Sequence, residues 1–221
     1  MVDNNKLREI ASQLRKPEGT KGIFMANMMN ETNINMTIHS IEKLDLSNDD
    51  RILELGHANC GHLAYLLSLK KNLSYCGLEI SELMVDESKR INCEFIDNDQ
   101  ASFYYYDGNI IPFPDLSFNK IFTVNTIYFW ENPTAFLLEL YRILKPNGIL
   151  SITFMDESYL ERMPFSRFYF NLYNKAKFSS IIQSTSFKIL DICFGKDFVE
   201  NKSDEAVERD FLTFKLGKEE G

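Results

Sequence analysis

Two acidic residues stand where apolar segments of this chain end. Glu54 is followed by Leu55 and Gly56, and Glu79 closes the next apolar segment along the chain. A carboxylate at the end of a buried strand accepts hydrogen bonds from amine or hydroxyl groups, and a glycine beside it lets a ligand approach the backbone. The pattern therefore favours a ligand that offers such donors over one that offers only phosphates.

Two further polar pairs follow later apolar segments: Asp107 with Gly108, and Asn125 with Thr126. In an open parallel sheet, ligands bind at the carboxyl ends of the strands. We therefore expect Glu79 to accept hydrogen bonds from ribose hydroxyls, and Asp107 to accept one from an adenine amine. Each acid taken alone fits a solvated strand end equally well. Their order along the chain favours a shared site.

The apolar segments alternate with segments of helical periodicity. Strands are predicted at 52–55, 73–80, 103–106, 120–126, 149–154, 187–194 and 211–216. Helices are predicted at 6–14, 36–45, 63–67, 81–91 and 133–144, with Ser81 as an N-cap. This alternation predicts an α/β three-layer sandwich with a mostly parallel sheet. A short acidic loop joins the last two strands, so the last strand is expected to lie antiparallel beside its neighbour.

Two segments interrupt the alternation. Residues 1–47 are expected to form an N-terminal helical lid segment ahead of a domain at 48–221. Within the lid segment, the methionines and asparagines of 23–38 alternate without a clean period, which predicts a turn-rich segment that covers the ligand crevice or packs on the sheet edge. The aromatic-rich insertion 156–185 likewise fits an apolar acceptor pocket or a helix packed on the sheet.

The composition is that of an ordinary globular enzyme, with 44% apolar and 25% charged residues among 221. A net charge of -8 without a lysine- or arginine-dense run argues against nucleic acid as the main partner. The four cysteines form no C-x-x-C pair, so neither a metal site nor a disulfide framework is expected. A polar N-terminus and the lack of a long apolar run predict a cytoplasmic protein with no membrane partner.

Five segments together resemble the class I, Rossmann-like methyltransferases that depend on S-adenosylmethionine (SAM). They are Ile-Leu-Glu-Leu-Gly at 52–56, Gly-Leu-Glu-Ile-Ser at 77–81, Asp-Gly at 107–108, Pro-Phe-Pro-Asp-Leu-Ser-Phe-Asn-Lys-Ile at 112–121 and Leu-Lys-Pro-Asn-Gly-Ile-Leu at 144–150. The likeness covers residues 48–155 and points to the small-molecule subgroup of ubiquinone/menaquinone-biosynthesis type. It implies a seven-stranded sheet with an antiparallel last strand, and SAM as the cofactor.

The resemblance also implies a role for each strand end. The cofactor-binding residues expected from it are Glu54, Gly56, His57, Ala58, Glu79, Ile80, Asp107, Gly108, Asn125 and Thr126. The loop at 56–61 would hold the methionine part, Glu79 the ribose, and Asp107 with Gly108 the adenine. The residues expected on the acceptor side are Tyr128, Trp130 and Phe165, for which an aromatic core cluster is an equally good interpretation.

The loop after the first strand departs from the family's Gly-x-Gly-x-Gly pattern, because Ala58 and Cys60 stand in it. Ala58 adds a methyl group where backbone and ligand approach closely. Cys60 is expected to take a backbone conformation normally left to glycine, and each change costs about 1 kcal/mol or more if the backbone keeps its path.

These features predict methyl transfer from SAM to a small, apolar or aromatic acceptor, by a monomer or homodimer. No catalytic base is assigned, because methyl transfer needs one only when the acceptor loses a proton, and His39, His57 and His62 each fit a structural role better. Two alternatives stay open. The loop with Glu79 approximates a dinucleotide site, as in an NAD-dependent oxidoreductase. The altered loop also fits a non-catalytic binding protein with the methyltransferase fold.

Overall fold

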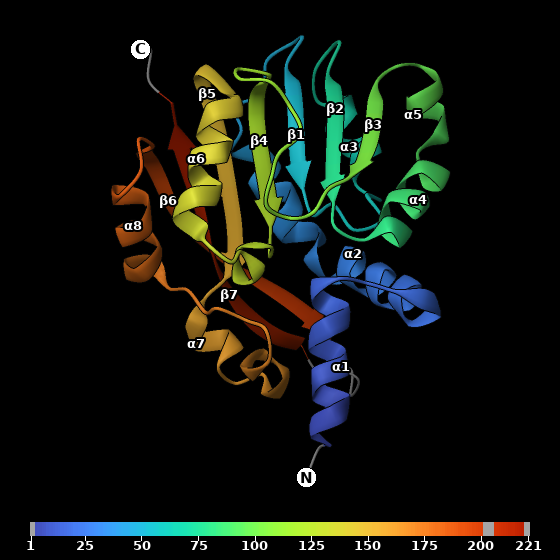
Figure 1. Cartoon of the computed structure of the whole chain (residues 1–221), viewed down its shortest axis with the longest axis vertical. Coiled ribbons are helices and arrows are strands. Elements are labelled where there is room, and N and C mark those ends of the chain that lie inside the picture. The colour runs from blue at the N-terminus through green and yellow to red at the C-terminus, as the bar shows by residue number, and fades with distance from the viewer. Residues whose placement is uncertain (1–2, 201–205, 219–221) are drawn as a thin grey trace.

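The structure, a computed structural model, describes residues 3–200 and 206–218. They form a seven-stranded sheet with the order β3-β2-β1-β4-β5-β7-β6 (Figure 1). The strands are β1 Arg51–Leu55, β2 Ser74–Glu79, β3 Ala101–Tyr105, β4 Phe118–Val124, β5 Leu144–Met155, β6 Lys188–Glu200 and β7 Ala206–Gly217. Strands β1 to β5 pair in parallel, whereas β7 is antiparallel to both β5 and β6. The predicted fold, with an antiparallel last strand inserted beside its neighbour, is confirmed.

Helices cover both faces of the sheet. They are α1 Asn4–Arg15, α2 Gly19–Glu42, α3 Leu63–Ser68, α4 Glu82–Ile91, α5 Cys93–Asp97, α6 Pro133–Ile143, α7 Glu157–Leu160 and α8 Lys175–Gln183, with the 3-10 helices η1 Ile127–Phe129 and η2 Pro164–Arg167. Alternate residues of a strand face opposite layers. Leu53 and Leu55 of β1 therefore share a buried cluster with residues of α6 and α8. Ile52 belongs instead to the cluster formed with α2, α3 and α4.

The carboxyl ends of the parallel strands share one edge of the sheet. Figure 1 shows α1, α7 and one end of the β6–β7 hairpin beyond this edge, so they extend past the strand ends. No helix of the described chain is both long and apolar enough to cross a membrane.

The predicted element starts are largely confirmed. The Ser81 hydroxyl accepts a hydrogen bond from the Met84 N–H as the N-cap of α4. Pro133 is the first residue of α6, as expected from its position after Asn132. Residues 145–148, which follow the predicted helix 133–144, lie inside β5 at an irregularity where its register with β4 shifts. Strands β6 and β7 are longer than predicted because they continue past the sheet core as a two-stranded hairpin.

The prediction that 23–38 is turn-rich was wrong, because this segment lies within the long helix α2. The buried residues of α2 are Gly22, Ala26, Met36, Thr37, Ser40 and Ile41. These positions have helical spacing at each end of the helix, but most are small or polar. The apolar stripe that identifies an amphipathic helix is therefore missing from the sequence. Contacts of α2 with β4, β5, β6 and β7 specify the helix instead.

A fully buried hydroxyl pair contributes to the packing of α2 on the sheet. The hydroxyl oxygens of Ser40 on α2 and Ser151 on β5 are 2.9 Å apart, and both residues are fully buried. A buried hydroxyl without a partner costs free energy that a bonded pair avoids. This pair therefore fixes both the position of α2 and the side of it that faces the sheet.

We expect Ser40→Ala to lower the free energy of unfolding by about 1–3 kcal/mol, because it leaves the Ser151 hydroxyl buried and unpaired. The double variant Ser40→Ala/Ser151→Ala is expected to lose less than the two single variants together, since it removes both polar groups. Urea denaturation of the four proteins measures this coupling. Strict additivity of the two losses would contradict the contact.

Candidate active site

A cavity of about 630 Å³ lies at the carboxyl ends of the parallel strands. Its sheet wall is formed by the predicted cofactor residues Glu54, Gly56, His57, Ala58, Glu79, Ile80, Gly108, Asn125 and Thr126. The predicted acceptor residues Tyr128, Trp130 and Phe165 also line it. Of all the predicted site residues, Asp107 alone does not line this cavity. The structure therefore brings together residues that lie far apart in the sequence.

The loop after β1 has the strained backbone that its sequence predicted. Ala58 and Cys60 have φ values of 49° and 53°, in the left-handed region that disfavours residues with a Cβ atom. Gly56 also has a positive φ, and a Cβ atom there would lie 2.4 Å from the Thr126 methyl carbon. The backbone at Gly56 and the Thr126 side chain are thus in close contact where β1 and β4 end.

The Glu79 carboxylate holds this loop against the end of β2. Its Oε2 accepts a hydrogen bond from the Ala58 N–H at 3.1 Å, and its Oε1 accepts from the N–H groups of Ile80 and Ser81 at 2.7 and 3.1 Å. Burial raises the pKa of Glu79 to about 7 in spite of these donors. Glu79 is therefore a buried acid that titrates near neutral pH.

Glu54 is the centre of a buried network that the sequence did not reveal. Its Oε2 accepts hydrogen bonds from His62 Nε2 at 2.8 Å and from the Tyr75 hydroxyl at 2.5 Å. The Cys60 thiol in turn donates to the Tyr75 hydroxyl at 3.2 Å. The network ties the C-terminal end of the loop, at Cys60 and His62, to β1 and β2. Sequence reasoning had no signal for Tyr75, which pairs with Ile52, so that the reach of its hydroxyl to Glu54 depends on strand register.

Potential metal-binding atoms of Glu54, Cys60 and His62 lie within 4.8 Å of one another. The Tyr75 hydroxyl already bonds to two of these side chains, donating to Glu54 and accepting from Cys60. Burial also raises the pKa of the Cys60 thiol well above its usual value, which opposes the thiolate form that binds metals. The chemistry of the group therefore favours a hydrogen-bonded network, and the sequence prediction of no metal site stays a prediction.

His57 shapes the loop. Its Nδ1 lies 2.9 Å from the Ala58 carbonyl oxygen and 3.0 Å from the Ser88 hydroxyl of α4. The ring also fills the space above Gly77, where a Cβ atom would lie 2.5 Å from it. Burial lowers the pKa of His57 to about 4, so the ring is neutral at pH 7. It does not hold a proton for catalysis at that pH.

The Asp107 side chain turns back onto its own loop. Its Oδ1 accepts hydrogen bonds from the N–H groups of Asn109 and Ile110, at 2.8 and 2.9 Å, and these donors lower its pKa. Asp107 is exposed, and only its neighbour Gly108, with a φ of 88°, reaches the cavity. The predicted contact of Asp107 with an adenine amine stays a prediction that requires the side chain to leave this turn.

Asn125 and Tyr128 hold the ends of β4 and β5 together beside the cavity. The Tyr128 hydroxyl donates to Asn125 Oδ1 at 2.9 Å and accepts from the Met155 N–H at 2.6 Å. Burial raises the pKa of Tyr128 far above its usual value, so the phenol stays protonated. Asn125 has a φ of 58°, which asparagine tolerates better than most residues.

The outer wall of the cavity is rich in methionines and aromatic rings. It is formed by residues of α1 and α2, the segments 128–130 and 155–170, and Arg209 of β7. Residues of this wall that the sequence analysis did not name individually include Met25, Met28, Met29, Asn33, Thr37, Met155, Tyr159, Leu160, Met163, Phe170 and Arg209. The segments 23–38 and 156–185 were each given a place at the ligand crevice as one of two interpretations, whereas Arg209 had no signal in the sequence.

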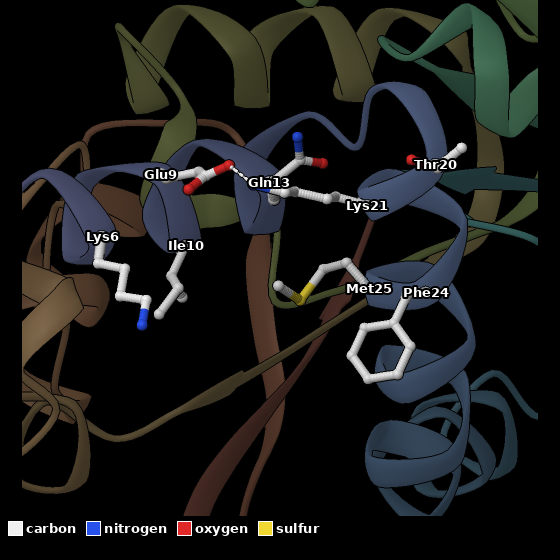
Figure 2. Close-up of a pocket in the computed structure, with 8 residues that line it drawn as sticks. All are labelled: Lys6, Glu9, Ile10, Gln13, Thr20, Lys21, Phe24 and Met25. Carbon is white, nitrogen blue, oxygen red and sulfur yellow. Dashed lines mark hydrogen bonds and ion pairs between the residues drawn. The ribbon is translucent and has the colours of Figure 1, made fainter.

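A second cavity, of about 370 Å³, lies between α1 and α2 (Figure 2). Ile10, Phe24 and Met25 line both this cavity and the larger one, so they separate the two. An ion pair between Glu9 and Lys21 joins the two helices beside it (Figure 2). Few side chains therefore divide the main cavity from the groove between the helices.

Comparison with known proteins relates this arrangement to a family. Residues 53–152, which include all residues of the sheet wall, match the family described as methyltransferase domain. This part of the chain is therefore similar to a methyltransferase domain. Putative methyltransferase YrhH of Bacillus subtilis (strain 168) is 31% identical over 108 residues, which are 49% of this chain and 59% of the relative. The match thus spans about three-fifths of that relative's length.

Solved structures share the fold of the methyltransferase domain. A chain from the complex between the Haloferax volcanii Trm112 methyltransferase activator and the putative methyltransferase is 17% identical, with a TM-score of 0.75 over 89% of this chain and 94% of that one. A SAM dependent methyltransferase from Aquifex aeolicus is 17% identical, with a TM-score of 0.61 over 98% of this chain and 99% of that one. The expected likeness to class I methyltransferases is confirmed in domain and fold, and the ubiquinone/menaquinone subgroup stays a prediction.

Replacing Ala58 by glycine is expected to raise the free energy of unfolding by about 0.5 kcal/mol. Relief of the left-handed backbone slightly outweighs the greater chain entropy of glycine in the unfolded state. Ala58→Val is the matched control and should lower stability, because a β-branched residue is strained further at this φ. Urea denaturation measures both. A loss of stability in Ala58→Gly would show that the methyl group makes a packing contact worth more than the strain.

The pKa values of Glu79 and His57 predict opposite pH dependences of stability. Because the pKa of Glu79 is raised from 4.5 to about 7, folded protein keeps a proton that unfolded protein loses, and this group's stabilisation falls as pH rises through that window. Because the pKa of His57 is lowered from 6.5 to about 4, its contribution to stability rises with pH between those values. The two effects oppose each other in the intact protein.

Removing Glu79 is expected to separate the two effects. We expect the stability of wild type relative to Glu79→Ala to be greatest near pH 4.5 and to fall until about pH 7. Above that pH the difference should be constant. Urea denaturation of both proteins across this range provides the measurement. A difference that stays constant with pH would mean that Glu79 keeps an acid's ordinary pKa, and one that grows with pH would mean that folding lowers this pKa.

Proposed function

We propose that this protein transfers a methyl group from SAM to a small apolar or aromatic acceptor. The observation that carries the proposal is one cavity in which strand-end acids and the loop after β1 face a wall of methionines and aromatic rings. When bound, SAM supplies an electrophilic methyl group on a sulfonium ion. The residues of the sheet wall would bind and orient this cofactor, and the outer wall would hold the acceptor.

The Glu79 carboxylate fits a ribose. It has about four acceptor positions, and the N–H groups of Ala58, Ile80 and Ser81 use three of them. One position is left for a ribose hydroxyl. Since a hydroxyl donor favours the charged carboxylate, binding would also lower the raised pKa of Glu79.

The network around Glu54 would set the position of the methionine part of the cofactor. Two donors, His62 Nε2 and the Tyr75 hydroxyl, already bond to Oε2 of Glu54. They fix the carboxylate in place and leave its other oxygen to accept from an amine. Because Glu54 lines the cavity and is only 3% exposed, its negative charge attracts a cationic ligand with little screening by water.

The outer wall would orient the acceptor and exclude water from it. Methyl transfer is an in-line displacement, so most of its rate can come from positioning and desolvation. The side chains that line this wall from α2, such as Met25, Met28 and Met29, are flexible and adapt to an apolar ligand. Tyr128, Trp130 and Phe165 would add flat surfaces on the same side.

The two N-terminal helices would act as the lid of this cavity, as proposed for residues 1–47. Ile10 and Leu14 of α1 and Met28 of α2 line the cavity. The other end of α2 packs on the sheet through Met36 and Ile41, both almost fully buried. The lid is thus anchored at one end of α2, and α1 with the start of α2 is the part that would move to admit ligands.

Substituting Glu79 by alanine is expected to weaken binding of the product, S-adenosylhomocysteine, at least tenfold, about 1.4 kcal/mol, because the ribose loses its acceptor. Glu82→Ala is the matched control, since Glu82 is exposed three residues further along and its loss should leave affinity unchanged. Isothermal titration calorimetry with S-adenosylhomocysteine and with NAD provides the readout. Equal affinities of Glu79→Ala and wild type would remove Glu79 from the cofactor site.

The same titrations distinguish the alternatives to methyl transfer. Binding of NAD but not of S-adenosylhomocysteine would support an oxidoreductase with a dinucleotide in this cavity. Binding of neither would support a non-catalytic protein in which Ala58 and Cys60 have closed the cofactor loop. Binding of S-adenosylhomocysteine by wild type, lost in Glu79→Ala, supports the proposed function.

A further inference from the structure

Arg209 is a buried cation in the outer wall of the cavity. It lies on β7, lines the cavity and is only 4% exposed. The other cation among the described residues that line the cavity, Arg15, is exposed. A guanidinium is costly to bury away from water unless its charge and its N–H groups are matched. Its placement among methionines and aromatic rings therefore requires an explanation.

Only some of the N–H groups of the Arg209 guanidinium have hydrogen-bond partners among the described residues. Nη2 donates to a carboxylate oxygen of Asp197 on β6 and to the carbonyl oxygen of Thr32 on α2. Nη1 makes a long contact of 3.5 Å with Asn33 Oδ1. Nε is buried and has no hydrogen-bond partner in the described chain. A guanidinium carries more N–H donors than these contacts use.

The counter-ion Asp197 is itself shared among several donors. Its Oδ1 accepts hydrogen bonds from Asn35 Nδ2 at 2.8 Å and from the Phe198 N–H at 2.9 Å, in addition to the Arg209 contact through Oδ2. These donors share the negative charge of Asp197 with Arg209. Arg209 thus keeps donor capacity for another anion.

The charges of the cavity are separated between its two walls. Glu54 and Glu79 are buried in the sheet wall, whereas Arg209 is buried in the outer wall. The acids favour a cationic cofactor on their side, and the guanidinium favours an anion on the other. The methionines and aromatic rings that line the same wall favour an apolar body attached to that anion.

We propose that Arg209 binds a carboxylate on the methyl acceptor, so that the acceptor class is an apolar or aromatic carboxylate. The identity of the bound molecule as the methyl acceptor rests on the proposed function. The anion site itself depends only on the residues of the outer wall. The carboxylate accepts a hydrogen bond from the Nη1 N–H that the contacts with Asp197, Thr32 and Asn33 leave free. The apolar body of the acceptor contacts the methionines and rings beside it.

The competing interpretation is that the Arg209–Asp197 ion pair only fastens α2 to the β6–β7 hairpin. Thr32 and Asn33 contact Arg209, and Asn35 contacts Asp197, so the pair does join these elements. If the pair is purely structural, removing either partner has the same effect. If Arg209 binds an anion, the two variants change the affinity for a carboxylate in opposite directions. Arg209→Gln removes the positive charge that binds it, and Asp197→Asn removes the competing negative charge.

The test compares octanoate with its neutral analogue octanamide on protein saturated with S-adenosylhomocysteine. Trp130 is the one tryptophan of the chain and lines the cavity, so its fluorescence reports on ligands bound there. We expect octanoate to bind wild type at least about tenfold more tightly than octanamide, as a charge-assisted contact requires. Arg209→Gln should bind the two ligands within about twofold of each other, and Asp197→Asn should keep or increase the preference for octanoate.

Several outcomes would overturn the proposal. They are equal affinities of wild type for octanoate and octanamide, a preserved preference in Arg209→Gln, and a lost preference in Asp197→Asn that keeps its fold by circular dichroism. If Arg209→Gln does not fold, wild type and Asp197→Asn still decide the matter. Repeating the titrations without S-adenosylhomocysteine separates the two proposals, because an Arg209-dependent preference there supports the anion site even if the cofactor assignment fails.

Discussion

Burial of two carboxylates at neighbouring strand ends is the constraint on which the site depends. A buried carboxylate is costly unless it is hydrogen-bonded or protonated. Glu54 meets this requirement with side chains, His62 and Tyr75, whereas Glu79 meets it with backbone N–H groups. Because its donors are backbone groups, Glu79 also constrains the loop after β1. Ala58 presents its N–H to Glu79, and it does so with a positive φ.

This constraint explains why the loop keeps its shape without the usual glycines. The carboxylate contact and the buried Cys60 both act to hold backbone conformations that cost about 1 kcal/mol each in isolation. Cys60 gains in return a fully buried side chain and a hydrogen bond to Tyr75. Strain of this kind persists where surrounding contacts over-determine the backbone, which is the situation found here. The departure from the family pattern is therefore compatible with an ordered cofactor loop.

Local pattern predicted most of the sheet and of its wall, because those residues belong to short segments with their own periodicity. The polar residues Glu54, Glu79 and Asn125 stand at or beside the ends of short, almost continuously buried apolar runs. Asp107 shows what local reasoning leaves out, since its own loop offers N–H donors that compete with any ligand. The prediction that 23–38 is turn-rich was wrong for a different reason. The buried positions of α2 are chosen by packing on the sheet, not by an apolar stripe.

The place of Arg209 in the cavity could not be predicted from local sequence patterns. This residue becomes part of the cavity only because β7 inserts between β5 and β6 and continues past the sheet core, which places residues near 209 beside α2. The sequence predicted the antiparallel strand but began it at Phe211, two residues too late to include this side chain. Topology, rather than composition, therefore decides which charges face the acceptor.

The protonation states of the cavity bear on what kind of acceptor it suits. His57 is neutral with its Nδ1 directed to the loop, His62 bonds to Glu54, and the Tyr128 phenol is protonated and donates to Asn125. These groups are thus committed to holding the walls. An acceptor that must lose a proton during attack would need a base from elsewhere. An acceptor whose attacking atom carries no proton needs no such base, and its carboxylate on Arg209 serves to position it. The geometry and the charge of Arg209 thus agree with the lack of a committed base in the two walls.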